Sequence, residues 1–179
     1  MRFGLVFLII LFPLFLAAQT YSGGLELQIY VTGFIPSLKF EKIIRENNAI
    51  NFRLGANLFD RRSFGEQDEE RGVGYGLTVG YRRYHKENRS WSLGLRSGLW
   101  FNKVNWKNLD GIEVVSSGTS EVVALQPTVE LGYLFFLDDE GFFINPTFSF
   151  GMELNLINNG APVRDGIVVL FGATVGKRF

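Results

Sequence analysis

Few residues of this chain could do chemistry. The chain has one histidine, His85, and no cysteine. Thiolate metal sites, cysteine nucleophiles and sites built from several histidines are therefore excluded. His85 falls in a short polar segment beside Lys86, and no G-x-S-x-G sequence indicates an activated serine. We interpret His85 as a solvated turn residue and predict no catalytic residue, no cofactor and no metal ion.

An acidic segment offers the other chemistry, because carboxylate oxygens can bind divalent cations. It contains Glu66, Asp68, Glu69 and Glu70. Its spacing does not match a calcium loop. Acidic runs of this kind are usually solvated, so we interpret the segment as a loop tip.

Composition limits the function classes further. The chain of 179 residues carries 18 basic and 18 acidic side chains, whereas nucleic-acid binding needs a basic excess. We therefore predict no nucleic-acid partner. The counts of 18 Phe, 6 Tyr, 3 Trp and 21 Gly are unusual for a soluble protein.

The first twenty residues have the order of a secretory signal. Arg2 precedes an apolar segment at residues 3–16, and Ala17 and Ala18 offer a small-residue cleavage site. A membrane anchor is the alternative, but the segment contains Pro13 and is shorter than the roughly 20 residues that a spanning helix needs. We predict a cleaved signal at residues 1–18 and one domain at residues 19–179. Export without cysteine fits a bacterial envelope.

After the signal, apolar residues alternate with polar or small ones, which predicts β-strands. Seven segments show this clearly: residues 25–31, 50–58, 73–81, 91–101, 123–135, 142–154 and 167–175. A shorter eighth segment, residues 37–43, alternates too. We predict a tight connection at Gly33–Pro36 before it, because Pro interrupts strand pairing. One long strand kinked at Pro36 is the alternative for residues 22–43.

The connections differ in length in a regular way. Short ones are expected at residues 45–48, 85–89 and 138–141, and long ones at residues 60–71, 102–120 and 155–166. Asp110-Gly111 is a hairpin signal inside the longest connection. We therefore expect residues 102–120 to form a ribbon that projects beyond the other strands.

The alternation fits either a soluble sheet or a membrane barrel, and other features decide between them. Glycine is frequent in the polar phase, which suits a crowded, curved interior. Aromatic residues gather near strand ends, as in the interfacial girdles of membrane barrels. They are Trp91, Phe135, Phe142 and Phe179 at one end, and Tyr75, Phe101 and Trp106 at the other. The sequence thus predicts an all-β, antiparallel, up-and-down transmembrane β-barrel, with a secreted lipocalin-like soluble barrel as the alternative.

These features together resemble the small outer-membrane β-barrel family of the OmpA transmembrane domain and OmpX, over essentially all of residues 20–179. Bacterial barrels have even strand numbers, which favours eight. The resemblance implies that the barrel insertion machinery reads the last strand through Phe171, Ala173, Val175 and Phe179. Lys177 departs from this pattern, and its side chain could extend to the membrane interface.

If apolar residues face lipid, the polar phase fills the lumen. That phase collects nine charged side chains: Glu26, Lys39, Glu41, Arg53, Arg82, Arg96, Glu130, Glu153 and Arg178. The interior of an eight-stranded barrel is just wide enough for side chains, and unpaired buried charges are costly. We predict a salt-bridged plug, with a narrow polar path as the alternative.

The sequence thus favours a non-enzymatic, integral outer-membrane barrel with its termini in the periplasm. Its expected role is envelope structure or surface adhesion. The expected partners are outer-membrane lipid, lipopolysaccharide, the insertion machinery and an extracellular ligand at residues 102–120. A lipid-modifying enzyme and a small solute pore are the alternatives.

Overall fold

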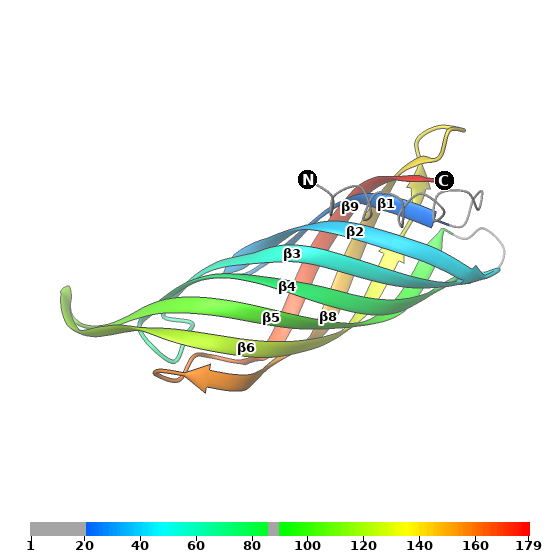
Figure 1. Ribbon diagram of the computed structural model, residues 1–179. Coiled ribbons are helices and arrows are strands. Elements are labelled where there is room, and N and C mark those ends of the chain that lie inside the picture. Colours follow the sequence, from blue (N-terminus) through cyan, green and yellow to red (C-terminus); the bar gives the residue numbers. More distant parts are fainter. Residues whose placement is uncertain (1–20, 86–89) are drawn as a thin grey trace, which may run out of the picture.

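The computed structural model describes residues 21–85 and 90–179, and its strands form one antiparallel sheet (Figure 1). The predicted signal and residues 86–89 of one predicted turn lie outside the described residues. The strands are β1 (Tyr21–Tyr30), β2 (Gly33–Arg45), β3 (Asn48–Arg62), β4 (Glu69–Tyr84), β5 (Trp91–Asp110), β6 (Glu113–Tyr133), β7 (Phe135–Phe136), β8 (Phe142–Asn159) and β9 (Gly166–Arg178). No helix in this part of the chain is long and apolar enough to cross a membrane.

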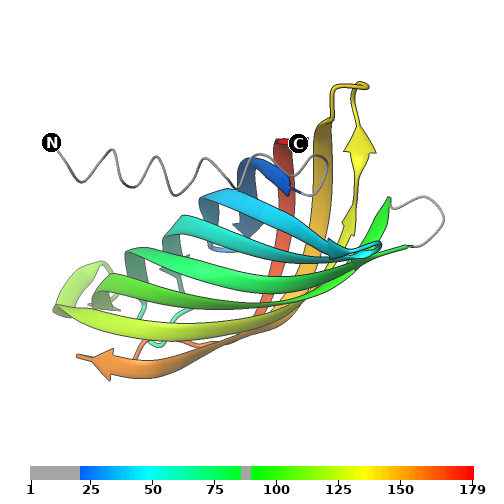
Figure 2. The same cartoon turned by 45° about the vertical axis from the view of Figure 1, so that its right-hand side comes forward.

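The sheet closes on itself. Each of the first five strands pairs with the next, β8 pairs with β6 and β9, and β9 returns to β1. The two-residue β7 continues β6 beyond Leu134 and pairs with the same neighbour, β8. The described residues thus form an eight-stranded up-and-down barrel with tilted strands (Figures 1 and 2), and the predicted fold is confirmed.

The predicted connection at Gly33–Pro36 is wrong. The chain turns at residues 31–32, and Gly33–Pro36 already belong to β2, where Pro36 lies opposite Leu27 of β1. On the other side of β2, the pairing with β3 skips from Phe34 to Ser37. Because Pro36 lacks an N–H, the strand tolerates it where one ladder is interrupted. Residues 21–45 are therefore two strands rather than one kinked strand.

The strands also extend further than their apolar alternation. The predicted long connections at residues 60–71 and 155–166 shrink to residues 63–68 and 160–165. Backbone pairing continues where outward side chains become polar, as at Asp60 opposite Arg71. The ribbon predicted at residues 102–120 is present. Its strands reach a turn at Gly111, which has a φ of 63°, and it projects at the left of Figure 1.

Side-chain burial is inverted relative to a soluble barrel. Along each strand, the apolar phase faces outward and the polar phase faces the lumen. Leu25 and Leu95 are 65% and 64% exposed, whereas Glu26 is 2% exposed. A band of exposed Leu, Val, Ile and Phe around a closed sheet is typical of a surface in contact with lipid.

Glycines on the inward face make room for a large ring. A Cβ at Gly76 would lie 2.5 Å from Cε3 of Trp100, and a Cβ at Gly98 would lie 2.8 Å from its Nε1. Both distances are shorter than side chains tolerate. The two glycines therefore let Trp100 turn into the lumen, where it is almost fully buried.

The lipid-facing assignment predicts a phase-dependent response to charge. Leu95 and Val129 lie opposite each other on β5 and β6, between the aromatic residues of the two ends. Replacing either with Arg should lower the free energy of unfolding in lipid vesicles by roughly 2–4 kcal/mol near the midplane. Thr128→Ser, in the inward phase beside Val129, is the control and should cost much less. Equal losses in both phases would contradict the assignment.

Candidate functional site

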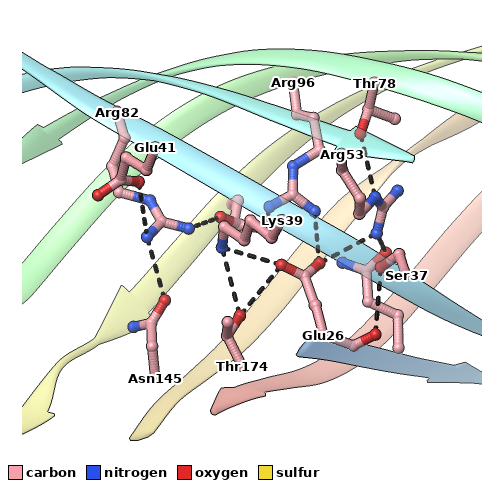
Figure 3. Close-up of polar contacts among 12 residues, drawn as sticks. Glu26, Ser37, Lys39, Glu41, Arg53, Thr78, Arg82, Arg96, Asn145 and Thr174 are labelled. Carbon is pink, nitrogen blue, oxygen red and sulfur yellow. Dashed lines mark hydrogen bonds and ion pairs between the residues drawn. The ribbon is translucent and has the colours of Figure 1, made fainter. Parts of the chain in front are cut away.

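The lumen is the most elaborate polar site of the described chain. Because inward positions alternate along every strand, neighbouring strands bring charged side chains to the same level. Seven buried residues form what we term the central network: Glu26, Lys39, Glu41, Arg53, Arg82, Arg96 and Glu130. They come from β1 to β6, and Figure 3 shows most of them in mutual contact.

Glu26 lies at the middle of this network. Its carboxylate is 2.9 Å from Lys39 Nζ, 3.0 Å from Arg53 Nη1 and 2.9 Å from Arg96 Nη1. The Thr174 hydroxyl of β9 donates a further hydrogen bond to it, at 3.1 Å (Figure 3). Three cations and a hydroxyl thus compensate the desolvation of one carboxylate.

Glu130 connects Glu26 with the rest of the network. Arg96 extends from Glu26 to Glu130, with 2.6 Å between Nη2 and Oε2. Arg82 forms an ion pair with Glu130 and a second one with Glu41, at 3.3 Å. Arg82 also donates a hydrogen bond of 3.0 Å to the side chain of Asn145. The charges therefore form one continuous chain across the lumen.

Two of the nine predicted lumen residues lie apart from the central network. Glu153 is buried nearer the long loops, where its Oε1 is 3.1 Å from Nη2 of Arg61. Arg178 lies at the opposite end, with its guanidinium 4.9 Å from the centre of the Phe136 ring. Glu153 thus pairs with Arg61, which is not among the nine predicted lumen residues.

Arg61 and Glu70 are lumen residues that the sequence analysis missed. The interpretation of Glu70 as part of a solvated loop tip is wrong, because its side chain is fully buried and pairs with Arg61 at 3.3 Å. Glu70 also accepts hydrogen bonds from the backbone N–H groups of Glu66 and Arg164, at 2.8 and 3.4 Å. Both residues continue the inward phase of β3 and β4, so longer strand assignments would have found them.

These contacts join two loops across the mouth of the barrel. Arg61 donates a hydrogen bond of 2.9 Å to the backbone oxygen of Arg164. The Arg164 side chain in turn donates to the backbone oxygen of Phe64. We term Arg61, Glu70, Glu153 and Arg164 the loop clasp. It holds the connection after β3 against the connection after β8.

Apolar layers flank the central network at both ends. The layer below the loop clasp contains Ile35, Phe59, Trp100, Val104, Val122, Ala124, Val163 and Leu170. The layer at the other end contains Ala49, Tyr84, Leu134 and Phe143. A cavity beside Lys39, Glu41 and Arg82 has a volume of only about 10 Å³, at the lower limit for one water molecule. The lumen is therefore packed at its centre, whereas a cavity of about 200 Å³ lies at the loop clasp, beside Arg61, Glu153 and Arg164.

This arrangement offers no obvious reaction centre. Within residues 21–85 and 90–179, no three His, Asp or Glu side chains are grouped so that they could hold a metal ion. His85 is exposed at the end of β4, away from the central network. The buried carboxylates of the central network contact cations. The chemistry that the site supports is charge compensation.

Most predicted interface aromatics lie on the outward face. Tyr75 stacks on Phe101 near the loop clasp, with 5.6 Å between ring centres. Trp91, Phe135 and Phe142 are exposed at the other end. Trp106 is the exception, because it lies in the inward phase over Gly118 and is half-buried. Trp106 is six residues after the inward-facing Trp100, and the bulge at Asn108 comes only after it. The alternation along β5 therefore already predicts that Trp106 faces inward.

Three residues of the expected assembly signal share the outward face of β9, and the fourth, Phe179, follows directly after this strand. Phe171 packs against Phe148 of β8, with 5.3 Å between ring centres. Ala173 and Val175 follow on the same exposed face. Phe179 is partly exposed, and its N–H donates to the backbone oxygen of Tyr21 at 2.8 Å.

Breaking the central network should destabilise the barrel strongly. Arg96→Met removes a cation from both Glu26 and Glu130 and should lower the free energy of unfolding by about 3–5 kcal/mol. Arg71→Met is the matched control, because Arg71 forms an exposed ion pair with Asp60 at 2.8 Å. It should cost about 0–1 kcal/mol. Urea unfolding in lipid vesicles measures both, and equal costs would contradict the proposed compensation.

Comparison with known proteins extends the fold assignment. No protein-family model and no curated protein matches the chain. Among solved structures, it is similar to Ail, the attachment invasion locus protein of Yersinia pestis, at 14% identity and a TM-score of 0.53, over 89% of this chain and 97% of that one. It is also similar to Neisserial surface protein A, at 12% identity and a TM-score of 0.51, over 89% of this chain and 95% of that one. A third similar structure is the N-terminal barrel domain of Pseudomonas aeruginosa OprF, at 11% identity and a TM-score of 0.50, over 89% of this chain and 98% of that one. The chain thus has the fold of the eight-stranded outer-membrane β-barrels.

Proposed function

We propose that this protein is a non-enzymatic, integral outer-membrane barrel that contacts extracellular partners through its β5–β6 hairpin. The fold supports the location, and the packed lumen argues against a solute pore. Because the lumen is filled by paired side chains, the surfaces available for recognition lie at the ends of the barrel. The observation that carries the proposal is the unpaired edge of this hairpin.

The edge arises because β6 is longer than its second neighbour. β6 begins at Glu113, but its pairing with β8 begins only at Glu121, opposite Asn159. Over residues 113–120, the described strands therefore supply β6 with a partner on one side only, β5. On the other side, residues 160–161 contact Thr119 and Ser120, and the edge before them, residues 113–118, presents its backbone groups to the surroundings. Such an edge can accept an extended peptide by strand addition.

The tip of the hairpin adds an apolar contact to this edge. Ile112 is 96% exposed, and Val114 and Val115 are also exposed. They lie beyond the last paired residues of the neighbouring strands, outside the lipid-facing band. Three neighbouring aliphatic side chains in such a position suit an apolar anchor of a partner.

The proposed orientation places the hairpin outside the cell. The longest strand extension and the loop clasp lie at one end, whereas the close turn at residues 46–47 and the end of β9 lie at the other. Outer-membrane barrels combine long extracellular loops with short periplasmic turns. The hairpin end is therefore assigned to the extracellular side, and the N- and C-terminal ends of the barrel to the periplasm.

A second contact, with lipopolysaccharide, is favoured by cations outside the barrel. Arg62, Arg71, Lys103 and Lys107 are exposed on adjacent strands at the hairpin end, beyond the Tyr75–Phe101 pair. Their height suits the phosphate groups of lipids in the outer leaflet. One solved Ail structure is a complex with the heparin analogue sucrose octasulfate, so polyanion binding has a precedent on this fold.

We also propose that the outward face of β9 directs assembly. The family that the sequence resembles implies that the insertion machinery reads this strand. The contacts of Phe179 support a local role in the finished barrel, because it closes the β1–β9 seam through Tyr21. Its own apolar contribution should therefore be modest, at roughly 1–3 kcal/mol.

The hairpin proposal predicts that intact cells bind an unfolded polypeptide. A suitable probe is reduced, carboxymethylated α-lactalbumin, which cannot fold and presents extended segments. Ile112→Asp should weaken binding about tenfold, because it removes an apolar anchor. Replacing residues 109–115 with Asn-Gly keeps a hairpin turn, removes the tip and shortens the free edge. It should abolish binding.

Val31→Asp is the matched control for this experiment. Val31 is 84% exposed at the β1–β2 turn, at the same end of the barrel as Ile112. Its replacement should leave binding unchanged. Equal weakening by both substitutions would contradict the role of the hairpin. Failure of intact cells to bind, while the purified barrel binds, would reverse the proposed orientation.

The assembly proposal predicts different effects of two aromatic substitutions. Phe179→Ala and Phe135→Ala remove exposed rings from the same end of the barrel. Both purified variants should refold in detergent, since each loses only one interfacial ring. In cells, only Phe179→Ala should accumulate in the periplasm, as measured by fractionation. Normal insertion of Phe179→Ala would show that Phe179 is an ordinary interface residue.

A further inference from the structure

One arginine on the lipid-facing surface has no partner in the described chain. Arg83 is exposed on β4, where it lies opposite Leu93 of β5, which in turn lies opposite Leu131 of β6. His85 and Trp91 mark the end of the barrel, where the His85 N–H donates to the Trp91 oxygen at 2.8 Å. Strands rise by about 3.4 Å per residue, so Arg83 lies about 7 Å from His85 along the strand, toward the bilayer.

Two other outward cations at this end are accommodated by the protein itself. Lys42 lies over the ring of Tyr21, at 5.1 Å from its centre. Lys177 lies 4.6 Å from the centre of the Phe142 ring and 3.8 Å from Glu140. Within residues 21–85 and 90–179, the Arg83 side chain forms no ion pair, ring contact or hydrogen bond. Its guanidinium carries five N–H donors.

A groove begins beside this arginine. It has a volume of about 770 Å³ and lies on the outer wall of β4, β5 and β6. Its apolar lining includes Leu93, Leu95, Val129 and Leu131, and Trp91 stands at its rim. Trp91 is fixed there by an edge-to-face contact with Tyr133, with 4.8 Å between ring centres. The groove therefore joins one cationic end to an apolar wall directed toward the bilayer centre.

We propose that this groove is a binding site for one anionic phospholipid of the periplasmic leaflet. The Arg83 guanidinium binds the phosphate, for which its planar donors are well suited. One acyl chain lies along the leucine-lined wall, and Trp91 contacts the headgroup region. A cation without a partner among the described residues favours a lipid with net negative charge over a zwitterionic one. The assignment to the periplasmic leaflet rests on the orientation given under the proposed function, whereas the lipid site itself is independent of that orientation.

The experiment measures lipid retention by the purified barrel in neutral detergent, with native mass spectrometry as the readout. Phosphatidylglycerol and phosphatidylcholine with identical acyl chains are the two probes. The unmodified barrel should retain one phosphatidylglycerol with about tenfold higher affinity than phosphatidylcholine, as expected for one charge-assisted contact. Arg83→Gln should abolish this preference, and Arg83→Lys should restore part of it.

Lys42→Gln is the matched control, because it removes an outward cation from the same end without touching the groove. It should retain the preference for phosphatidylglycerol. The heat-dependent gel mobility of each variant verifies that the barrel is folded. An unchanged preference in Arg83→Gln, or an equal loss in Lys42→Gln, would overturn the site. Because detergent micelles have no leaflets, the result is independent of the extracellular role of the hairpin.

Discussion

The buried carboxylate of Glu26 is the interaction on which the barrel interior depends. It joins cations from β2, β3 and β5 and a hydroxyl from β9, so one side chain of β1 connects distant parts of the ring. In a barrel whose apolar side chains face outward, polar and charged side chains fill much of the lumen. Their charges must be paired with opposite charges, because unpaired buried charges are costly. The central network contains four cations and three carboxylates, and the loop clasp pairs Arg61 with two carboxylates. The central network thus carries one surplus positive charge, whereas the loop clasp, with Arg61 and Arg164 against Glu70 and Glu153, is balanced.

This filled interior moves recognition to the ends and the outer wall. Apolar layers lie on both sides of the central network, and the loop clasp joins two loops across one mouth. The same rigid sheet supports the β5–β6 hairpin, whose strands continue beyond their neighbours in unbroken register as far as Asn108. A free strand edge on a rigid base loses little conformational entropy when it binds an extended partner.

The period of two in the sequence predicted most strands and the face of nearly every residue, whereas the number eight came from the even strand numbers of bacterial barrels. Of the nine charged residues assigned to the inward phase, all but Arg178 are buried. A register error would have exposed an entire row of them. Prediction failed where apolar alternation and backbone pairing end at different positions. Pro36 resembles a strand terminator but lies within β2, at a gap in one ladder.

Pairing partners were harder to predict than faces. They depend on the stagger between strands, which sets the height of each side chain and is absent from the alternation pattern. Glu153 therefore meets Arg61 rather than one of the arginines of the central network. Glu70 belonged to an acidic run that resembled a solvated tip, and only its parity on an extended β4 placed it inside. The groove at Arg83 depends in the same way on three adjacent strands.

Single-channel recording tests the central claim most directly, namely that paired charges fill the lumen. The purified barrel would be inserted into planar lipid bilayers and recorded under an applied voltage. If the central network and its flanking layers seal the lumen, each inserted barrel should leave the bilayer without a steady conductance. A reproducible stepwise conductance for every insertion would show a continuous aqueous path and would contradict the account.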